Sequence, residues 1–414
     1  MNLQAPKGTR DLTGAEVLAF AELESVARST FDLFQFTEIR TPIFEAVELF
    51  SRSLGETSDV VEKEMFTFTD RGERTFALRP EGTAGVVRHF VENSLAVKGG
   101  PHRFFYVGPM FRAERPQAGR YRQFWQIGSE HFGPSDAVAD ADTVLMIAQL
   151  LRGFGLVNFS IQVNSLGCRD CRPNHRAALM AYLKTKEKDL TDDSKRRMLI
   201  NPLRVLDSKL DGPKLPDAPA MTAYLCSVCR SHHKTFLQLL TEASLPFQEN
   251  PRLVRGLDYY TRSVFEFVSP DLGAQSALAA GGRYDELVEQ LGGPRTPAVG
   301  FALGMDRVVG ARKSGAVANG SKRAMAVVIP LMEEAVPLCF ALSQELRLQN
   351  ISIPPVTASK KLKYQLSNAV EIGANWAILV GEDEIKANKV TVKNLSTREQ
   401  TQVSKDKLVS LIRG

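Results

Sequence analysis

The stretch Phe111-Arg-Ala-Glu-Arg-Pro-Gln-Ala-Gly-Arg-Tyr-Arg-Gln-Phe-Trp-Gln126 places four arginines between two aromatic segments. Residues 102–108 and 124–132 on either side have strand-like compositions, and Gly119 suits a turn, so we predict a strand–loop–strand hairpin. A planar guanidinium binds a phosphate through two hydrogen bonds and stacks on a nucleobase, which a lysine does poorly. A solvated basic loop would contain the same arginines, but the aromatic flanks favour a binding site at the face of a sheet.

The segments around this hairpin predict a mostly antiparallel sheet. Residues 66–78 alternate like a second hairpin with its turn at 70–73, and residues 263–268 have a strand pattern. Several strands with few helices between them are typical of the α+β class. Residues 167–246 are rich in Lys, Asp and Leu, which predicts a helical insertion.

The pattern of the chain changes after a small, polar stretch at 311–322, which we interpret as a linker. Beyond it, strands alternate with helices, which indicates a small α/β domain of about 90 residues. The predicted strands are 324–331, 351–357, 376–380 and an edge strand at 389–395. The predicted helices are 333–349 and a second one that Ser359 caps and Gly373 terminates.

Composition and charge exclude several classes of protein. The chain has 414 residues, of which 43% are hydrophobic and 24% charged, as in globular proteins and unlike disordered or fibrous ones. The net charge of +5 is compatible with a polyanionic partner. The N-terminal MNLQAPKGTRD lacks the apolar segment of a secretory signal, no stretch reaches the ~18–20 apolar residues of a membrane span, and five cysteines are too few for a disulfide scaffold. We therefore expect a cytoplasmic protein with no membrane partner.

Three more clusters of polar residues suggest parts of a binding site, and each also has a purely structural interpretation. Leu78-Arg-Pro-Glu-Gly-Thr-Ala84 would hold a ligand ammonium or cap a helix. Val254-Arg-Gly-Leu-Asp-Tyr-Tyr-Thr261 indicates a pocket wall, because buried polar groups need partners, or else a polar rim on an edge strand. Ala280-Gly-Gly-Arg-Tyr-Asp285 and the strand–helix junction at Arg307 allow a ligand to approach closely, or reflect packing alone; we expect Arg307 to project at a sheet edge.

These clusters occur together, in this order, ahead of an α/β domain, and the sequence contains neither a P-loop nor a GxGxxG motif after a strand. The combination resembles the class II aminoacyl-tRNA synthetases, most closely the histidyl-tRNA synthetase family, over nearly the whole chain. Residues 40–45, 111–126 and 300–307 resemble the three class motifs, the first associated with dimerisation, and 255–260 and 281–284 resemble the two histidine-specific motifs. The resemblance implies an antiparallel-sheet catalytic domain over 1–320, with the insertion at about 167–246, and an anticodon-binding α/β domain over 324–414.

The resemblance also implies roles for individual residues. Arg112 and Arg255 match arginines at the α-phosphate of ATP, Arg307 matches one at the γ-phosphate, and Glu114 belongs to the same ATP site. The positions expected to bind the amino acid are Glu81, Thr83 and Gln126 around its α-amino group and Glu130, Tyr259, Tyr260 and Tyr284 around its imidazole. The implied cofactor is Mg²⁺ with ATP, and no side chain is assigned as a metal ligand.

The implied activity is that of a homodimeric histidine–tRNA ligase, which attaches L-histidine to tRNA(His) through a histidyl-adenylate and releases AMP and pyrophosphate. Adenylate formation joins two anions, so arginines and Mg²⁺ that offset their repulsion are the expected catalysts. An imidazole has two ring nitrogens to satisfy, so an acidic acceptor such as Glu130 would reject apolar amino acids. Lys360, Lys361 and Lys363 in the second domain would contact tRNA phosphates or form a solvated helix face.

A non-catalytic relative of these enzymes, the histidine-binding regulatory subunit of ATP phosphoribosyltransferase, is the alternative. Such relatives usually lack the C-terminal domain and parts of the histidine-specific motifs. Arg112, Arg255, Arg307 and a C-terminal α/β domain are all present in this sequence, which favours the enzyme.

Two CxxC pairs, Cys168 with Cys171 and Cys226 with Cys229, flank most of the predicted insertion. Their separation is much longer than the ~15–20 residues of a zinc ribbon, but a structural Zn²⁺ would join the two ends of the insertion. Additional candidate ligands are His175, His232 and His233. Free thiols are the other interpretation, and the sequence leaves the choice open.

Overall fold

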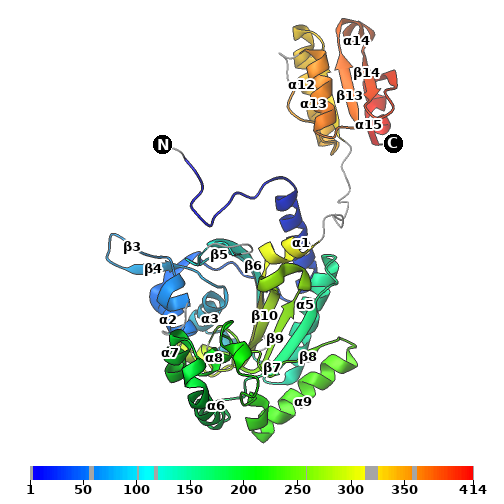
Figure 1. Ribbon diagram of the computed structural model, residues 1–414. Helices are drawn as coiled ribbons and strands as arrows, with labels where there is room; N and C mark the ends of the chain where they lie inside the picture. The colour runs from blue at the N-terminus through cyan, green and yellow to red at the C-terminus, as the bar shows by residue number, and fades with distance from the viewer. Residues whose placement is uncertain are drawn as a thin grey trace. The chain divides into compact units, whose positions relative to one another are not determined.

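The protein folds as two compact units, Met1–Ala316 and Val317–Gly414 (Figure 1). The structure is a computed structural model that describes residues 3–55, 60–99, 102–115, 120–257, 259–312, 325–356 and 361–413. None of the helices in these ranges is long and apolar enough to cross a membrane.

An eight-stranded, mostly antiparallel sheet forms the centre of the first unit. In spatial order its strands are β1 (Thr37–Glu38), β5 (His102–Phe111), β6 (Gln123–Phe132), β11 (Ala298–Gly304), β10 (Ala277–Arg283), β9 (Thr261–Val268), β7 (Ser160–Ser165) and β8 (Gln248–Glu249). The parallel pairs, β1–β5 and β7–β8, lie at the two edges. The predicted hairpin is confirmed, because β5 and β6 pair along their whole length on either side of the arginine-rich segment. Gly119 lies outside the described residues.

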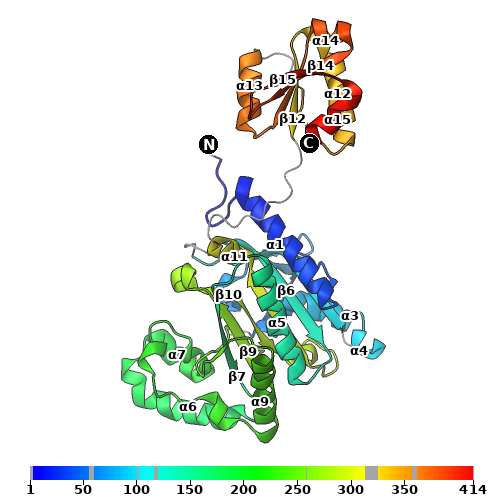
Figure 2. The same cartoon turned by 90° about the vertical axis from the view of Figure 1, so that its right-hand side faces the viewer.

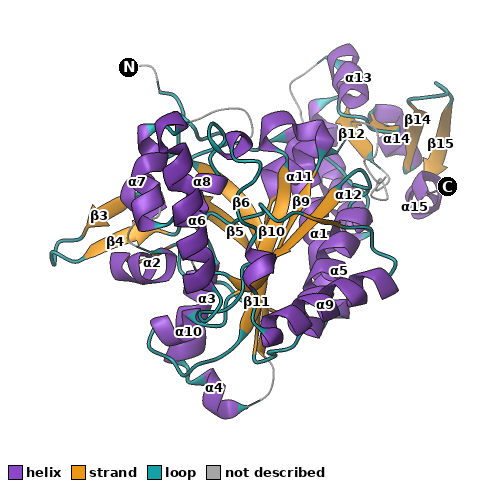
Figure 3. Cartoon of the chain, turned by 60° about the horizontal axis from the view of Figure 1, so that its bottom comes forward, coloured by secondary structure: helices purple, strands orange, loops and turns teal. Residues whose placement is uncertain are grey.

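Side chains alternate between the two faces of this sheet, so each face has its own core. Phe105 and Phe265 pack on the face that the longer helices cover, whereas Tyr106 and Phe132 pack on the opposite face. Figures 2 and 3 show these helices against the strands. The first face carries α1 (Gly14–Leu33), α5 (Ala137–Gly153), α9 (Ser227–Glu242) and α11 (Met305–Ala311); the second carries α2 (Val47–Leu54), α3 (Thr83–Glu92), α4 (Leu95–Lys98) and α10 (Leu287–Gln290).

The second predicted hairpin is also confirmed. β3 (Thr67–Thr69) pairs antiparallel with β4 (Thr75–Leu78), and β2 (Phe44–Ala46) completes a three-stranded sheet. At the turn, the Asp70 carboxylate accepts hydrogen bonds from the backbone N–H groups of Gly72 and Arg74 at 2.9 and 3.0 Å. Such a local side-chain acceptor stabilises the turn that the sequence indicates.

The predicted insertion is helical, as expected. It contains α6 (Arg172–Lys186), α7 (Asp192–Ile200) and α8 (Leu203–Leu206), and α9 leads back from it to the large sheet. A small core of its own, including Leu179, Leu183, Met198 and Val205, holds these helices together. The insertion is therefore a folded substructure with its own core and not an extended loop.

The second unit is an α/β fold built on the sheet order β12–β13–β14–β15, in which the first pair is parallel and the others antiparallel. Gly373 follows the end of α13 with φ +78, the left-handed conformation predicted for a helix terminator. The elements are β12 (Ala326–Pro330), α12 (Val336–Leu348), α13 (Leu362–Glu371), β13 (Trp376–Val380), α14 (Glu382–Ala387), β14 (Lys389–Asn394), β15 (Gln400–Ser404) and α15 (Lys405–Arg413).

Two predictions for the second unit were wrong. Of the strand predicted at 351–357, the described residues 351–356 do not form one: Ser352 makes a single bridge to Met325, and the adjacent Pro354 and Pro355 have no N–H to donate to a ladder. The segment at 389–395 is not an edge strand, because β14 lies between β13 and β15. The sequence prediction missed β15, which is polar and largely exposed. The proposed cap Ser359 and most of the proposed linker lie outside the described residues.

A fully buried ion pair joins the sheet to α5. Arg283, at the end of β10, lies 2.5 Å from Asp140 and 3.1 Å from Asp285, and neither Arg283 nor Asp140 is exposed to solvent. The same guanidinium donates hydrogen bonds to the carbonyls of Pro134 and Asp136 at 2.7 and 2.8 Å. Because its donors are satisfied, this charge is tolerated inside the fold.

We expect Asp140→Ala to lower the free energy of unfolding by about 3–5 kcal/mol, because it leaves the Arg283 guanidinium buried with too few partners. The matched control is Arg196→Ala, which removes a half-exposed pair with Asp193 and should cost less than ~1 kcal/mol. Urea unfolding followed by circular dichroism measures both. Equal losses for the two variants would contradict a special role for the buried pair.

Candidate active site

One cleft on the second face of the large sheet collects every site residue that the sequence analysis named. Its lining includes the three arginines and Glu114, and it includes all seven positions expected to bind the amino acid: Glu81, Thr83, Gln126, Glu130, Tyr259, Tyr260 and Tyr284. These side chains come from β6, the first turn of α11, the start of α3, the hairpin loop, the segment before β9 and the residue after β10. Strand alternation explains part of the grouping, because Gln126 and Glu130 are separated by an even number of residues on β6.

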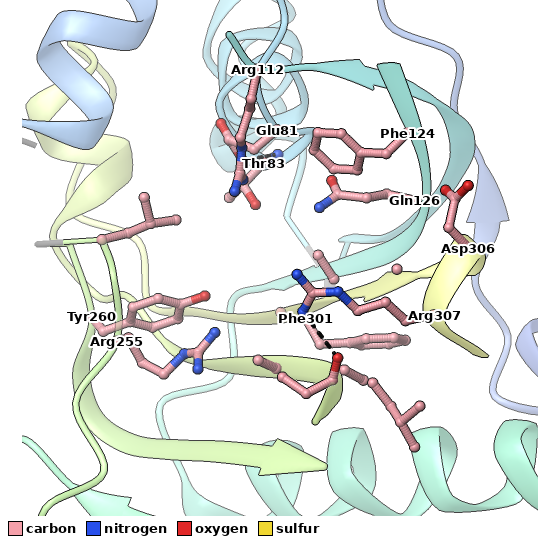
Figure 4. Close-up of a pocket in the computed structure, with 18 of the residues that line it drawn as sticks. Glu81, Thr83, Arg112, Phe124, Gln126, Arg255, Tyr260, Phe301, Asp306 and Arg307 are labelled. Atoms are coloured by element: carbon pink, nitrogen blue, oxygen red, sulfur yellow. Dashed lines mark hydrogen bonds between the residues drawn. The ribbon is translucent and has the colours of Figure 1, made fainter. Parts of the chain in front are cut away.

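The three arginines come from distant parts of the chain and are each held by a hydrogen bond. Arg112 Nε donates to the Pro80 carbonyl at 3.0 Å, and its guanidinium lies 5.3 Å from the centre of the Phe124 ring. Arg307 Nη1 donates to the Ala277 carbonyl at 3.1 Å. Figure 4 shows Arg112, Arg255 and Arg307 extending into the same opening.

The expectation that Arg307 lies at a sheet edge was wrong. Arg307 is in the first turn of α11, directly after β11, and β11 is a central strand between β6 and β10. The residue therefore projects from the end of a central strand, which brings it opposite Arg112 and Arg255 (Figure 4).

The positive charges at this end of the cleft repel one another. Burial lowers the pKa of Arg307, and the neighbouring Arg120 and Arg112 lower it further. Glu114 offsets part of this charge, because it lies 2.8 Å from Arg120 and 3.9 Å from Arg112. An anion that entered the cleft would relieve the remaining repulsion, so this end is suited to a polyphosphate.

Arg255 differs from the other two arginines because it has a dedicated carboxylate. Its Nη1 donates to Glu266 Oε1 at 2.8 Å, on the neighbouring strand β9. Burial disfavours its charged form, but Glu266 and Tyr260 outweigh burial and raise the pKa of Arg255. Its Nε has no hydrogen-bond partner among the described residues. Arg255 is thus fixed in its charged form with a donor still available.

The segment at 78–84 caps a helix and also faces the cleft. Glu81 accepts hydrogen bonds from the backbone N–H groups of Thr83 and Ala84 at 2.6 and 2.9 Å, so its carboxylate caps the N-terminus of α3. Burial raises the pKa of Glu81, and these two N–H groups oppose the rise. Close by, Gln126 Oε1 has no partner among the described residues. Glu81 and Gln126 therefore provide acceptors for a cationic group.

Glu130 lies in the most enclosed part of the cleft and is 1% exposed. Tyr284 donates a short hydrogen bond to Glu130 Oε2, and Tyr106 OH lies 3.5 Å from Oε1. Burial raises the pKa of Glu130 to about 8, although the Tyr284 hydroxyl opposes the rise. The carboxylate fits here because Gly300 has no side chain: a Cβ at that position would collide with Glu130 Oε2.

The sequence analysis missed three residues that hold this site together. Tyr106 projects between Gly82 and Gly128, where a Cβ on either glycine would collide with its ring, and it contacts Glu130. Glu266 pairs with Arg255. Asp306 receives the Trp125 backbone N–H at 3.0 Å and pairs with Arg10 at 2.8 Å, which fixes the N-terminal segment beside the cleft. The alternation of residues along β5 and β9 indicates which side chains share a face of the sheet with Tyr106 and Glu266. It does not distinguish a side chain that contacts a ligand from one that packs in the core.

Some motif residues lie elsewhere. Arg283, in the second histidine-specific motif, forms the buried pair with Asp140 described above and does not line the cleft. Asp258, in the first such motif, lies outside the described residues, as does Lys360. Lys361 precedes α13 in the second unit and Lys363 lies in its first turn; both side chains are exposed.

The chain is similar to known proteins along nearly its whole length. A family model described as histidyl-tRNA synthetase matches residues 8–308, and one described as an anticodon binding domain matches 325–414. The histidine–tRNA ligases of Thermosipho melanesiensis and Trichlorobacter lovleyi are 43% and 44% identical to it. These matches cover 98% and 97% of this chain and 97% and 96% of the relatives.

Solved structures agree with the sequence matches. The apo histidyl-tRNA synthetase of S. aureus has a TM-score of 0.84 at 30% identity and covers 100% of both chains. A Bacillus halodurans protein described as an ATP phosphoribosyltransferase regulatory subunit/histidyl-tRNA synthetase has a TM-score of 0.68 at 20% identity, which shows a shared fold alone. The predicted α+β class with a C-terminal α/β domain is confirmed, and this chain belongs to the histidyl-tRNA synthetase family.

Proposed function

We propose that this protein attaches L-histidine to tRNA(His) in an ATP-dependent reaction that passes through a histidyl-adenylate and releases AMP and pyrophosphate. The convergence of Arg112, Arg255 and Arg307 on one cleft, beside the enclosed carboxyl of Glu130, is the observation that carries this proposal. Relatives that are histidine–tRNA ligases match nearly the whole chain at 43% identity. The five cysteines are free, which suits the reducing cytoplasm where we place the activity.

At the arginine end, we propose that ATP binds with its triphosphate among the guanidinium groups. Arg112 and Arg255 contact the α-phosphate from opposite sides, and Arg307 contacts the γ-phosphate. The histidine carboxylate is already ionised, so attack on the α-phosphate needs charge compensation and alignment and no general base. Arg255 supports the developing negative charge best, because Glu266 holds it in place before the substrates arrive.

Mg²⁺ is the proposed cofactor and enters with ATP. This ion prefers oxygen ligands and is usually held by phosphates with one or two carboxylates. Glu114 lines the arginine end of the cleft and Glu266 lies beside Arg255, so the residues present fit a magnesium–ATP complex. The ion would neutralise part of the charge on the phosphates, while the arginines orient the phosphates for attack.

At the enclosed end, we propose that the histidine side chain binds between Glu130 and the tyrosines. Tyr259, Tyr260 and Tyr284 are almost fully buried and form an aromatic wall. Glu130 accepts a hydrogen bond from one imidazole nitrogen. The α-ammonium group lies near Glu81, Thr83 and Gln126, whose oxygens face the same space. An apolar amino acid would leave the buried Glu130 without this partner, which disfavours its binding.

We assign the two units different tasks: residues 1–320 activate histidine, with the insertion at about 167–246, and residues 324–414 bind the anticodon region of the tRNA. Exposed Lys361 and Lys363 at the start of α13 support the second assignment, because the positive helix terminus makes this an unfavourable place for lysines without an anion. We also propose a homodimer, supported by the exposed Ile43, Phe44 and Phe68 in and beside the region of the first motif.

The main alternative, a regulatory subunit of ATP phosphoribosyltransferase that binds histidine without charging tRNA, is less supported. The only structure named above with that description shares the fold at 20% identity. A regulator has no use for three arginines held around a triphosphate-sized space, or for a unit that matches an anticodon-binding domain.

Histidine-dependent exchange of radioactive pyrophosphate into ATP tests the function and the role of Arg255. The wild-type chain should catalyse exchange, and Arg255→Ala should lower the rate by about 10²-fold or more, because it removes charge compensation at the α-phosphate. Arg295→Ala, at an exposed arginine outside the cleft, is the control and should retain full activity. No exchange from folded wild-type protein would favour the regulator, and full exchange by Arg255→Ala would remove Arg255 from the mechanism.

Glu130→Gln tests the histidine pocket. A lost hydrogen bond that leaves a buried polar group without its partner costs about 1–3 kcal/mol, so the dissociation constant for histidine should rise by roughly 5- to 150-fold. The dissociation constant for ATP should change less than about twofold, since Glu130 lies at the opposite end of the cleft from the arginines. Isothermal titration calorimetry measures both. Equal weakening of the two ligands would contradict the assignment.

The same variant has a pH signature that requires no ligand. The pKa of Glu130 is raised from 4.5 to about 8, so between these values the folded protein keeps a proton that the unfolded chain has lost. The wild-type protein therefore loses stability as pH rises from about 5 to about 8, and the Glu130→Gln substitution removes this loss. The variant should gain melting temperature relative to the wild type across this range. A constant difference would mean that Glu130 ionises normally in the fold.

Lys361→Glu combined with Lys363→Glu tests the tRNA assignment of the second unit. Loss of phosphate contacts should raise KM for tRNA and lower the salt dependence of binding by about one unit per lost contact. Pyrophosphate exchange should stay unchanged, because the cleft lies in the other unit. Lys405→Glu combined with Lys407→Glu, in the first turn of α15, is the control with the same change in charge. An equal effect of the control would indicate a response to net charge and not a contact made by α13.

A further inference from the structure

The four cysteines of the two CxxC pairs, which the proposed reaction does not use, meet at one point of the fold. Cys168 and Cys171 lie in the turn between β7 and α6, and Cys226 and Cys229 lie at the start of α9. Residues 172–225, most of the insertion, lie between the two pairs. The first turns of α6 and α9 are therefore brought side by side (Figures 1 and 2).

The sulfur atoms form a compact group of four. Cys168 Sγ lies 3.6 Å from Cys171 Sγ and 4.0 Å from Cys226 Sγ, and every pair among the four lies within 4.8 Å. Four thiolates around a Zn²⁺ ion, each at ~2.3 Å, stand about 3.8 Å apart at the corners of a tetrahedron. A disulfide requires ~2.05 Å, and all four cysteines are free. The spacing matches a shared ion and not two covalent pairs.

The backbone around the cluster is arranged for sulfur ligands. The N–H of Cys226 donates to Cys171 Sγ at 3.1 Å, and the N–H of Cys229 donates to Cys226 Sγ at 3.5 Å, which favours thiolates over thiols. Gly167 makes the tight turn into the first pair with φ +60, and a Cβ there would collide with Cys171 and Met221. Met221 and Leu225 pack on the group, in which Cys171 and Cys229 are buried and Cys168 and Cys226 are half-buried.

We propose that Cys168, Cys171, Cys226 and Cys229 bind one structural Zn²⁺ that closes the insertion. The candidate histidines do not contribute: His175 contacts the Pro219 carbonyl, His232 lies beside Asp140, and His233 lies beside Glu249. Four protein thiolates fill a tetrahedral site, so the ion has no open position for catalysis. None of the four cysteines lines the cleft that contains the arginines.

The metal site has a structural link to the cleft. Arg172, the residue directly after Cys171, donates a hydrogen bond through its Nη2 to the backbone carbonyl of Tyr260. An ion that fixes the first turn of α6 therefore also fixes a support for the segment with Arg255 and Tyr260. A zinc ion in this position orders the insertion against the segment with Arg255 and Tyr260, without taking part in the reaction.

Metal analysis of the full chain, purified under reducing conditions without chelators, tests the proposal. The wild-type protein should contain about one zinc per chain. Cys226→Ser and Cys168→Ser should lose most of it, whereas Cys339→Ser is the matched control: this buried cysteine belongs to the second unit and its substitution should leave the zinc content unchanged. Less than about 0.2 zinc per chain in folded wild-type protein supplied with zinc would overturn the proposal, as would zinc that survives loss of the cysteines.

A second measurement uses the wild-type protein, so that it does not depend on how the cysteine variants fold. Titration with an organomercurial reagent should release zinc in step with four thiols, detected by a metallochromic dye. Replacing zinc with Co²⁺ should give the intense visible absorption and the sulfur-to-metal charge transfer of a tetrahedral thiolate site. A weak octahedral spectrum, zinc release without thiol modification, or bound iron in place of zinc would each overturn the assignment.

Discussion

Repulsion among like-charged guanidinium groups is the constraint around which the first unit is built. Arg112, Arg120 and Arg307 face one cleft, and their mutual repulsion together with burial lowers the pKa of Arg307. Such an arrangement persists only if the fold holds each group in place. The anchors are backbone carbonyls of Pro80 and Ala277, supplied by segments far apart in the sequence. A polyphosphate bound among these groups would relieve the repulsion, and charge that is preorganised in this way lowers a reaction barrier.

The other end of the cleft has a buried acidic group instead of several cations. There the protein encloses Glu130 among tyrosines, and burial instead of a neighbouring cation determines its pKa. A buried carboxyl group destabilises the fold unless a ligand or a hydroxyl group forms a hydrogen bond with it. The same cost of burying Glu130 would disfavour a ligand that cannot form that hydrogen bond. The glycines at 128, 282 and 300 make this possible, because they leave room for Tyr106, Tyr260 and Glu130 on a sheet that is otherwise close-packed. One sheet face thus provides an open cationic end and a closed neutral end.

The sequence was most informative where several functional groups are adjacent in the chain. The arginine-rich hairpin, the 78–84 segment and the 254–261 segment were predicted as site elements, and the structure brings them to one cleft. The prediction missed Tyr106 and Glu266 because each lies between two apolar residues of a strand, where cross-strand partners depend on sheet order. The order of strands in a sheet depends on contacts between distant parts of the chain, which the local sequence does not reveal. For the same reason, the sequence analysis wrongly predicted Arg307 at a sheet edge and residues 389–395 as an edge strand. Local chemistry, by contrast, was sufficient for Gly373 and the turn at Asp70.

No described residue of the insertion lines the cleft, yet the segment with Arg255 and Tyr260 depends on the insertion. Two arginines of the insertion, Arg172 and Arg204, donate to the carbonyls of Tyr260 and Gly256. These residues precede β9, so they lack the ladder hydrogen bonds that hold the strand itself. Because local opening is easiest where backbone groups have few partners, loosening the insertion would free this segment before it disturbed the sheet. The placement of Arg255 in the cleft is therefore a joint property of the sheet, through Glu266, and of the insertion, through its arginines.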